Sequence, residues 1–238
     1  MLITPQDQGA KMFDTHVMVR PDMHGGHCFG ISAALHALEA AGISHAGLIA
    51  ACTDMNFAFL GEFCRQVRQI SLYTRVTAWA GVELLNIPPA LIRPAVAESR
   101  NCGAQIVLVH GESIMDAVEK GTNFAAIDAG VDILACPGML DQAAADLAAE
   151  RHVFVELSGS PRHAFANART IAMCNSSQVA IVCGSGASRA EELHSPELWS
   201  KIMEGADVSL DGSHPVLNAV RLGEKILMQR LQRSEQKN

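Results

Sequence analysis

Residues that can bind metal ions recur at the ends of short apolar runs along this chain. Each run is rich in β-branched residues and precedes a stretch with helical periodicity. In barrels built from such βα units the functional side chains follow the carboxyl ends of the strands, so these residues would meet at one mouth. Histidines, carboxylates and a thiol are the donors that hold zinc, manganese or iron. In chain order these positions are occupied by His16, Asp54, Glu83, His110, Cys136 and Glu156.

A single histidine after an apolar strand is more often an ordinary hydrogen-bonding group than a metal ligand. Recurrence of donors at successive strand ends favours a shared site instead. We therefore expect a divalent metal, zinc, manganese or iron, at the mouth of the fold.

The elements that must position these donors follow from hydrophobic periodicity. Nearly continuous apolar strands that alternate with helices are typical of a parallel sheet covered by helices. Without a long linker, the pattern predicts an α/β fold, a distorted TIM-like barrel of seven βα units, as a single domain over residues 1–238, with a C-terminal helix at about 213–232. The expected strands are 12–19, 46–52, 75–83, 104–110, 131–136, 153–157 and 179–183, and the expected helices are 31–41, 56–68, 89–99, 140–150 and 165–173.

Composition narrows the classes of partner. The net charge of −7 disfavours nucleic acid or an anionic membrane surface, because both would repel an acidic protein. No apolar segment is long enough to cross a bilayer, and no basic segment followed by an apolar one opens the chain. Seven scattered cysteines without a CxxC pair are typical of reduced thiols, so a cytoplasmic protein is expected.

Short motifs at the strand ends form a series. It begins with Asp-Thr-His-Val-Met at 14–18, Thr-Asp-Met at 53–55 and Gly-Val-Glu at 81–83, and continues with His-Gly-Glu at 110–112 and Ala-Cys-Pro-Gly at 135–138. The series resembles the PHP (polymerase and histidinol phosphatase) superfamily, in its histidinol-phosphatase-like branch. The likeness runs from about residue 12 to 220 and is most specific from Glu83 to Gly138. It implies a barrel of the PHP type and metal-dependent hydrolysis of a small phosphorylated substrate.

The resemblance also implies which side chains bind the metal. By position, His16, Glu83 and His110 keep the ligands of the family, and Cys136 stands where this branch usually has a histidine. These four residues imply one metal ion in place of the family's cluster of two or three. Residues that stand where other ligands are expected are Met18, Met55, Gly186 and Ser188.

Catalytic candidates lie beside this ligand set. His163 and Arg162 follow the sixth strand, where either could stabilise the charge that develops as a metal-activated water attacks phosphorus. For Arg162 an ordinary surface cation is the alternative. Asp54, at the second strand end, is a third catalytic candidate.

The loop after the first strand offers further donors. His24 and His27, with Cys28, are separated by glycines in the segment 22–28, which looks longer than the corresponding loop of the family. We hypothesise that His24 and His27 add ligands that rebuild the metal site. The alternative is a glycine-rich loop with exposed polar tips.

Two further functions stay open. The first is a catalytically inactive PHP-fold protein that binds another protein or a second copy of itself. A protein subunit of ribonuclease P shares this fold with an eroded site, although the acidic balance here disfavours RNA. The second is metal chemistry other than phosphate ester hydrolysis, which the sulfur-containing substitutions Met18, Met55 and Cys136 suggest.

Overall fold

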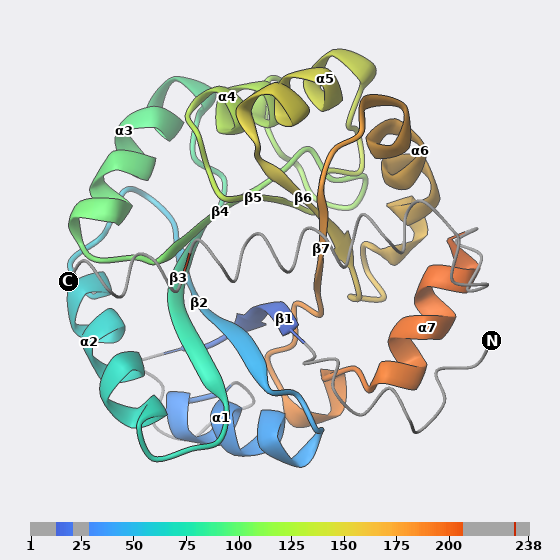
Figure 1. Ribbon diagram of the computed structural model, residues 1–238. Coiled ribbons are helices and arrows are strands. Elements are labelled where there is room, and N and C mark those ends of the chain that lie inside the picture. The colour runs from blue at the N-terminus through green and yellow to red at the C-terminus, as the bar shows by residue number, and fades with distance from the viewer. Residues whose placement is uncertain (1–12, 21–28, 207–230, 232–238) are drawn as a thin grey trace.

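The computed structural model describes residues 13–20, 29–206 and Leu231 (Figure 1). Seven parallel strands form one sheet in which spatial order follows chain order. The strands are β1 (Phe13–Met18), β2 (His45–Cys52), β3 (Thr77–Leu84), β4 (Ile106–His110), β5 (Ile133–Ala135), β6 (Phe154–Ser158) and β7 (Ile181–Gly184).

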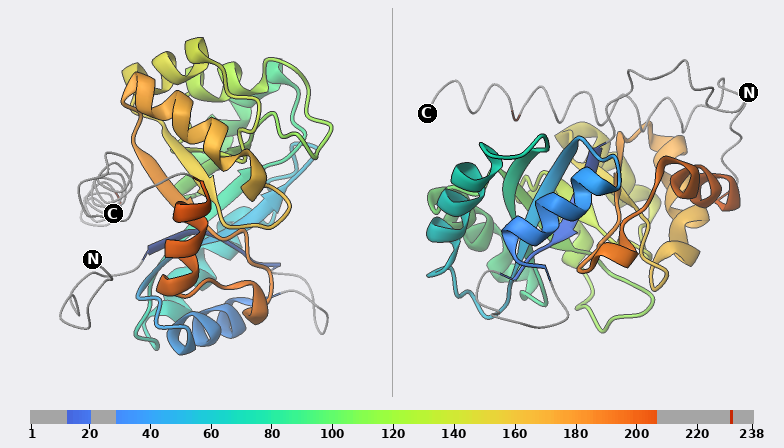
Figure 2. Two further views of the ribbon diagram at one scale, coloured as in Figure 1. Left: turned by 90° about the vertical axis from the view of Figure 1, so that its right-hand side faces the viewer. Right: turned by 90° about the horizontal axis from the view of Figure 1, so that it is seen from below.

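Helices cover the outer face of this sheet, as Figure 2 shows from two further directions. Two short 3-10 helices, Ala164–Ala166 and Ala190–Glu192, follow β6 and β7. The α-helices are α1 (Ile31–Ala40), α2 (Leu60–Ser71), α3 (Pro89–Asn101), α4 (Thr122–Asp128), α5 (Gln142–Arg151), α6 (Asn167–Ser177) and α7 (Pro196–Gly205). In the part of the chain that the structure describes, no helix combines the length and apolar character of a membrane span.

The sheet is nearly closed by the segment that follows β7. Val17 of β1 forms a parallel bridge with Ala187, and the Met18 amide donates to the Ala187 carbonyl over 2.8 Å. The Gly186 amide donates to the carbonyl of His16, also over 2.8 Å. These contacts confirm the predicted α/β fold, a TIM-like barrel of seven βα units.

Differences from the expected elements are small. Observed strand ends lie within about two residues of the expected ones. Helices α4 and α7 have no counterpart among the expected elements; α4 has only 7 residues, too few to establish a helical period. Of the predicted helix at 213–232 the structure describes only Leu231, which is helical and buried. The loop with His24, His27 and Cys28 lies outside the described residues.

Side chains alternate between the inside of the barrel and the helix-covered outer face along each strand, so the interior is built in layers. Trp79, Ile106 and Phe154 belong to the apolar cluster inside the barrel, whereas their chain neighbours pack in a second cluster under the helices. Because strand side chains repeat every two residues, the later inward positions of β3, β4 and β6 are Glu83, His110 and Glu156. The apolar layer therefore fills one end of the barrel, and acids and imidazoles occupy the carboxyl end.

Candidate metal centre

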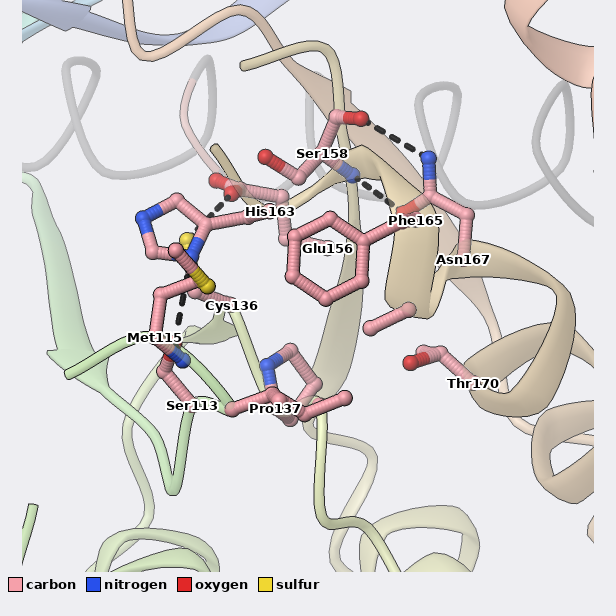
Figure 3. A pocket seen from close by; sticks show the side chains of 13 residues that line it. Ser113, Met115, Cys136, Pro137, Glu156, Ser158, His163, Phe165, Asn167 and Thr170 are labelled. Atoms are coloured by element: carbon pink, nitrogen blue, oxygen red, sulfur yellow. Dashed lines mark hydrogen bonds between the residues drawn. The ribbon is translucent and has the colours of Figure 1, made fainter. Parts of the chain in front are cut away.

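Three donor side chains from neighbouring loops converge at the carboxyl end of the barrel. One donor atom each from His110, Cys136 and His163 lie within 4.8 Å of one another. His110 ends β4, Cys136 follows β5, and His163 precedes the 3-10 helix Ala164–Ala166. Cys136 has a φ of 49°, a left-handed conformation that is uncommon outside glycine and recurs at functional sites. Figure 3 shows Cys136 and His163 in the wall of one pocket with Glu156.

Behind these donors, His16 lies between two buried carboxylates. Its Nδ1 atom is 2.7 Å from Oε2 of Glu156, and its Nε2 atom is 3.3 Å from Oε2 of Glu83. Nε2 also lies 3.2 Å from the sulfur of Met18. Burial disfavours the charged imidazolium, but the two glutamates outweigh this cost and raise the pKa of His16 well above its ordinary value.

His110 connects Glu83, and through it His16, to the rim of the site. Its Nδ1 atom is 2.9 Å from Glu83, and its Nε2 atom is 3.1 Å from Asp116. Asp116 also pairs with Arg162 and lies 3.5 Å from Nε2 of His163. Burial lowers the pKa of His110, yet the hydrogen bond and charge of Glu83, followed by those of Asp116, give a net rise. A continuous row of acids and bases thus runs from Glu156 to Arg162.

The carboxylates of this row respond in the opposite direction. Burial alone would raise the pKa of Glu83, but His16 and His110 hold it far below the usual range. Burial likewise opposes ionisation of Asp116, and the hydrogen bonds from Arg162 and His110 lower its pKa. The lowered pKa values of Glu83 and Asp116 and the raised pKa values of His16 and His110 thus favour the charged forms of these four groups.

For Cys136 and His163 the effect of burial is not overcome by the neighbouring groups. Burial, followed by the negative charges of Glu156 and Glu83, raises the pKa of the Cys136 thiol well above its usual value. Burial and the neighbouring His110 lower the pKa of His163, which favours the neutral imidazole that metals bind. A cation at this position would displace the thiol proton.

The donor set fits a borderline or soft divalent ion. Two imidazoles and one thiol suit zinc or iron(II), whereas magnesium and manganese prefer oxygen ligands. Glu156 lies 3.7 Å from the Cys136 sulfur through Oε1, so an oxygen donor adjoins the three. These residues fit the expected zinc or iron better than the expected manganese.

Gly184 makes room for the row. A Cβ atom at this position would overlap Oε2 of Glu156 and lie 2.7 Å from Cβ of His16. Real Cβ atoms do not approach other heavy atoms so closely. Glycine at the end of β7 is therefore a steric requirement for the His16–Glu156 pair.

Most of the predicted site residues meet in this region. His16, Glu83, His110 and Cys136 are joined by the contacts above, and so are the catalytic candidates His163 and Arg162; His163 is one of the three side chains whose donor atoms converge. Asp54 is exposed on the turn after β2, with a φ of 54°, and shares none of the contacts that join the described row. The proposed ligands His24 and His27 lie outside the described residues.

Sequence reasoning missed two members. Asp116 contacts three side chains of the site, and Ser113 lies 3.2 Å from Nδ1 of His163 through its hydroxyl. Both lie in the loop after β4, where spacing gives no indication of direction. The one available signal is an acid six residues after His110 in a loop that follows a strand end. Glu156 is recognisable in the sequence as a strand-end acid, but its position there assigns it no role.

Comparison with known proteins gives one sequence relative of note. No family model matches the chain. An uncharacterized protein of Methanocaldococcus jannaschii is 33% identical over 130 residues, which cover 54% of this chain and 60% of that protein. The match therefore spans less than two thirds of the relative.

Solved structures resemble the chain at the level of the fold. A chain of archaeal ribonuclease P, determined with mature tRNA, matches with a TM-score of 0.63 and 17% identity over 92% of this chain and 90% of that one. Aspergillus niger ochratoxinase matches with a TM-score of 0.57 and 12% identity over 89% of this chain and 69% of its own. A Xaa-Pro dipeptidase with methionine in its active site matches with a TM-score of 0.55 and 11% identity, over 93% and 75%. The chain thus has the barrel fold that hydrolases of the amidohydrolase type also use.

Proposed function

We propose that the protein is a metal-dependent hydrolase of the PHP type that acts on a small phosphate ester. The observation that carries the proposal is the convergence of His110, Cys136 and His163 within 4.8 Å at the carboxyl mouth of the barrel. Active sites of (βα) barrels lie at that end. The barrel is also the fold of solved hydrolases, which supports the reaction class without fixing the substrate.

His110, Cys136 and His163 would hold the ion, zinc or iron(II). When bound, such an ion supplies a Lewis acid and lowers the pKa of a coordinated water. The protein provides the orientation: Glu83 and Asp116 lie at the two ring nitrogens of His110, so an ion would replace one of these contacts and the other would hold the ring, while Ser113 restrains His163. A ligand held by such outer hydrogen bonds keeps one tautomer and one direction.

Glu156 is the residue best placed to move a proton. Its Oε2 atom is occupied by His16, and its Oε1 atom faces the Cys136 sulfur. Once the thiol has lost its proton, Oε1 is an acceptor at the wall of the pocket. Arg162, held by Asp116 at the rim with 57% of its side chain exposed, can attract an anionic substrate.

A non-catalytic binding protein is the second candidate. It is favoured by the likeness to a ribonuclease P chain, which extends over nine tenths of both molecules. In this case the row of acids and bases would serve stability alone.

Metal content separates the two functions. We expect near-stoichiometric zinc or iron in the purified protein, and less than about a tenth of that in His110→Ala and Cys136→Ala. His36→Ala, on the exposed face of α1, and Cys102→Ala, at the end of α3, are matched controls that should keep the metal. Hydrolysis of para-nitrophenyl phosphate should follow the metal content of each variant.

Two outcomes would contradict the proposal. Protein without metal that hydrolyses no aryl phosphate in the presence of added zinc, iron or manganese supports the binding function. Hydrolysis of an N-acyl amino acid but not of phosphate esters would keep the reaction class and replace the substrate.

A further inference from the structure

We propose that the site accepts substrates with an aromatic group next to the hydrolysed bond, held by an apolar lip of Ile114, Met115 and Phe165. This inference rests on the proposed function and adds the part of the substrate that does not react. The wall of the pocket includes the three lip residues together with Cys136 and His163. Figure 3 shows Met115 and Phe165 beside that pair.

The three side chains of the lip are about half exposed. Ile114 is 51% exposed, Met115 49% and Phe165 57%. Scattered exposed apolar residues need no explanation, but contiguous ones beside a polar pocket are typical of a binding surface. Ile114 and Met115 lie in the loop after β4 and Phe165 in the 3-10 helix after β6, and all three line a single pocket.

Close packing holds the segments that carry the lip together. A Cβ atom at Gly138 would lie 3.2 Å from Cγ1 of Ile114 and 3.2 Å from Cβ of Ala166, so the loops after β4, β5 and β6 meet at this glycine. Arg162 donates to the carbonyl of Met115 over 3.4 Å and pairs with Asp116. The lip is therefore fixed to the same residues that orient the metal donors.

The chemistry of the pocket changes from its floor to its edge. Cys136, Glu156 and His163 provide the polar floor, while the lip offers only carbon and one thioether sulfur. Small-molecule sites commonly combine a few polar groups with apolar walls, because the polar groups fix the orientation and apolar area supplies affinity. A reacting group on the floor would leave its neighbouring substituent against the lip. Aromatic rings pack well there, because the ring of Phe165 and the sulfur of Met115 both interact favourably with an aromatic group.

The test uses two phosphonates that cannot be hydrolysed. Naphthylmethylphosphonate presents an aromatic group and methylphosphonate does not, and both are titrated by calorimetry into the zinc-loaded protein. We expect the naphthyl compound to bind at least about tenfold more tightly, since burying a ring of this size contributes more than the 1.4 kcal/mol that corresponds to about tenfold. Phe165→Ala should weaken the naphthyl compound about tenfold and leave methylphosphonate within about twofold.

Two further variants sharpen the result. Met115→Ser should also weaken binding of the naphthyl compound. Agreement between this variant and Phe165→Ala would show that the loss does not come from a local folding defect in one of them. Leu72→Ala removes an apolar side chain that is 80% exposed at the end of α2, away from the pocket, and should change neither affinity.

Equal affinity for the two phosphonates, or an unchanged affinity for the naphthyl compound in both lip variants, would contradict the proposed role of the lip and leave the proposed metal centre unaffected. The proposed function fails separately, through absent metal or absent hydrolysis. A protein that binds neither phosphonate overturns the inference as well.

Discussion

The Nδ1 atom of His16 lies 2.7 Å from Oε2 of Glu156, and both side chains are almost fully buried. A buried charge pair is costly to desolvate, and its attraction compensates only when further hydrogen bonds are in place. Here Glu83 supplies a second partner for the imidazole. The pair is thus one part of a row whose members depend on one another.

His16→Gln should destabilise the metal-free protein in a pH-dependent way. The pKa of His16 is raised above its unfolded value of 6.5, so its contribution is fully present below that pH and is lost as pH rises through the folded pKa. Near pH 6 we expect a loss of about 3 kcal/mol in the free energy of unfolding, because Glu156 loses its charged partner and Glu83 keeps only His110. Urea unfolding of both proteins at a series of pH values measures the difference, which should shrink in alkali. A constant difference, or one as large in His36→Gln, would contradict the assignment.

Gly184→Ala tests the space that the His16–Glu156 pair needs. The added methyl would overlap the Glu156 carboxylate, so we expect a loss of about 1–3 kcal/mol in the free energy of unfolding together with weaker metal binding. Gly30→Ala is the matched control, since a Cβ there meets nothing within 4 Å. Equal stability of the two variants in chemical denaturation would argue against close packing at Gly184 as a constraint on the site.

The barrel could be predicted from sequence because its strands are local and repetitive. Apolar runs such as the one that ends in His110 show both the strand and its last residue. The direction of a loop side chain cannot be predicted in the same way. Whether Asp54 or Asp116 faces the mouth of the barrel depends on loop conformation, which hydrophobic periodicity does not determine. Asp54 belongs to the Thr-Asp-Met motif but lies on an exposed turn, whereas Asp116 belongs to no motif and contacts three side chains of the site. His163 can be proposed from its place after a strand, although its partnership with Cys136 as a donor requires the folded chain.

Asp116→Asn should lower the pKa of both neighbouring imidazoles. The negative charge of Asp116 contributes to raising the pKa of His110 and partly offsets the burial that lowers the pKa of His163. Titration of the ring carbon and nitrogen signals of the metal-free protein by nuclear magnetic resonance gives both values. Asp146→Asn, on the exposed face of α5, should leave them unchanged. Unaltered imidazole pKa values in Asp116→Asn would mean that the Asp116 carboxylate points toward solvent and does not contact His110.

Metal addition should stabilise the protein only when the full donor set is present. At a free zinc concentration about 100 times the dissociation constant, binding adds about 2.7 kcal/mol to the free energy of unfolding. For a chain of this size that corresponds to a rise of about 5–10 °C in Tm. His163→Ala and Cys136→Ala should lose most of this rise, and Cys102→Ala should keep it. Magnesium should have little effect, because the site offers nitrogen and sulfur where magnesium prefers oxygen. If magnesium raised Tm as much as zinc, or if Cys136→Ala responded like the wild type, the ion would sit among the carboxylates of Glu83, Glu156 and Asp116 and the thiol would not be a ligand.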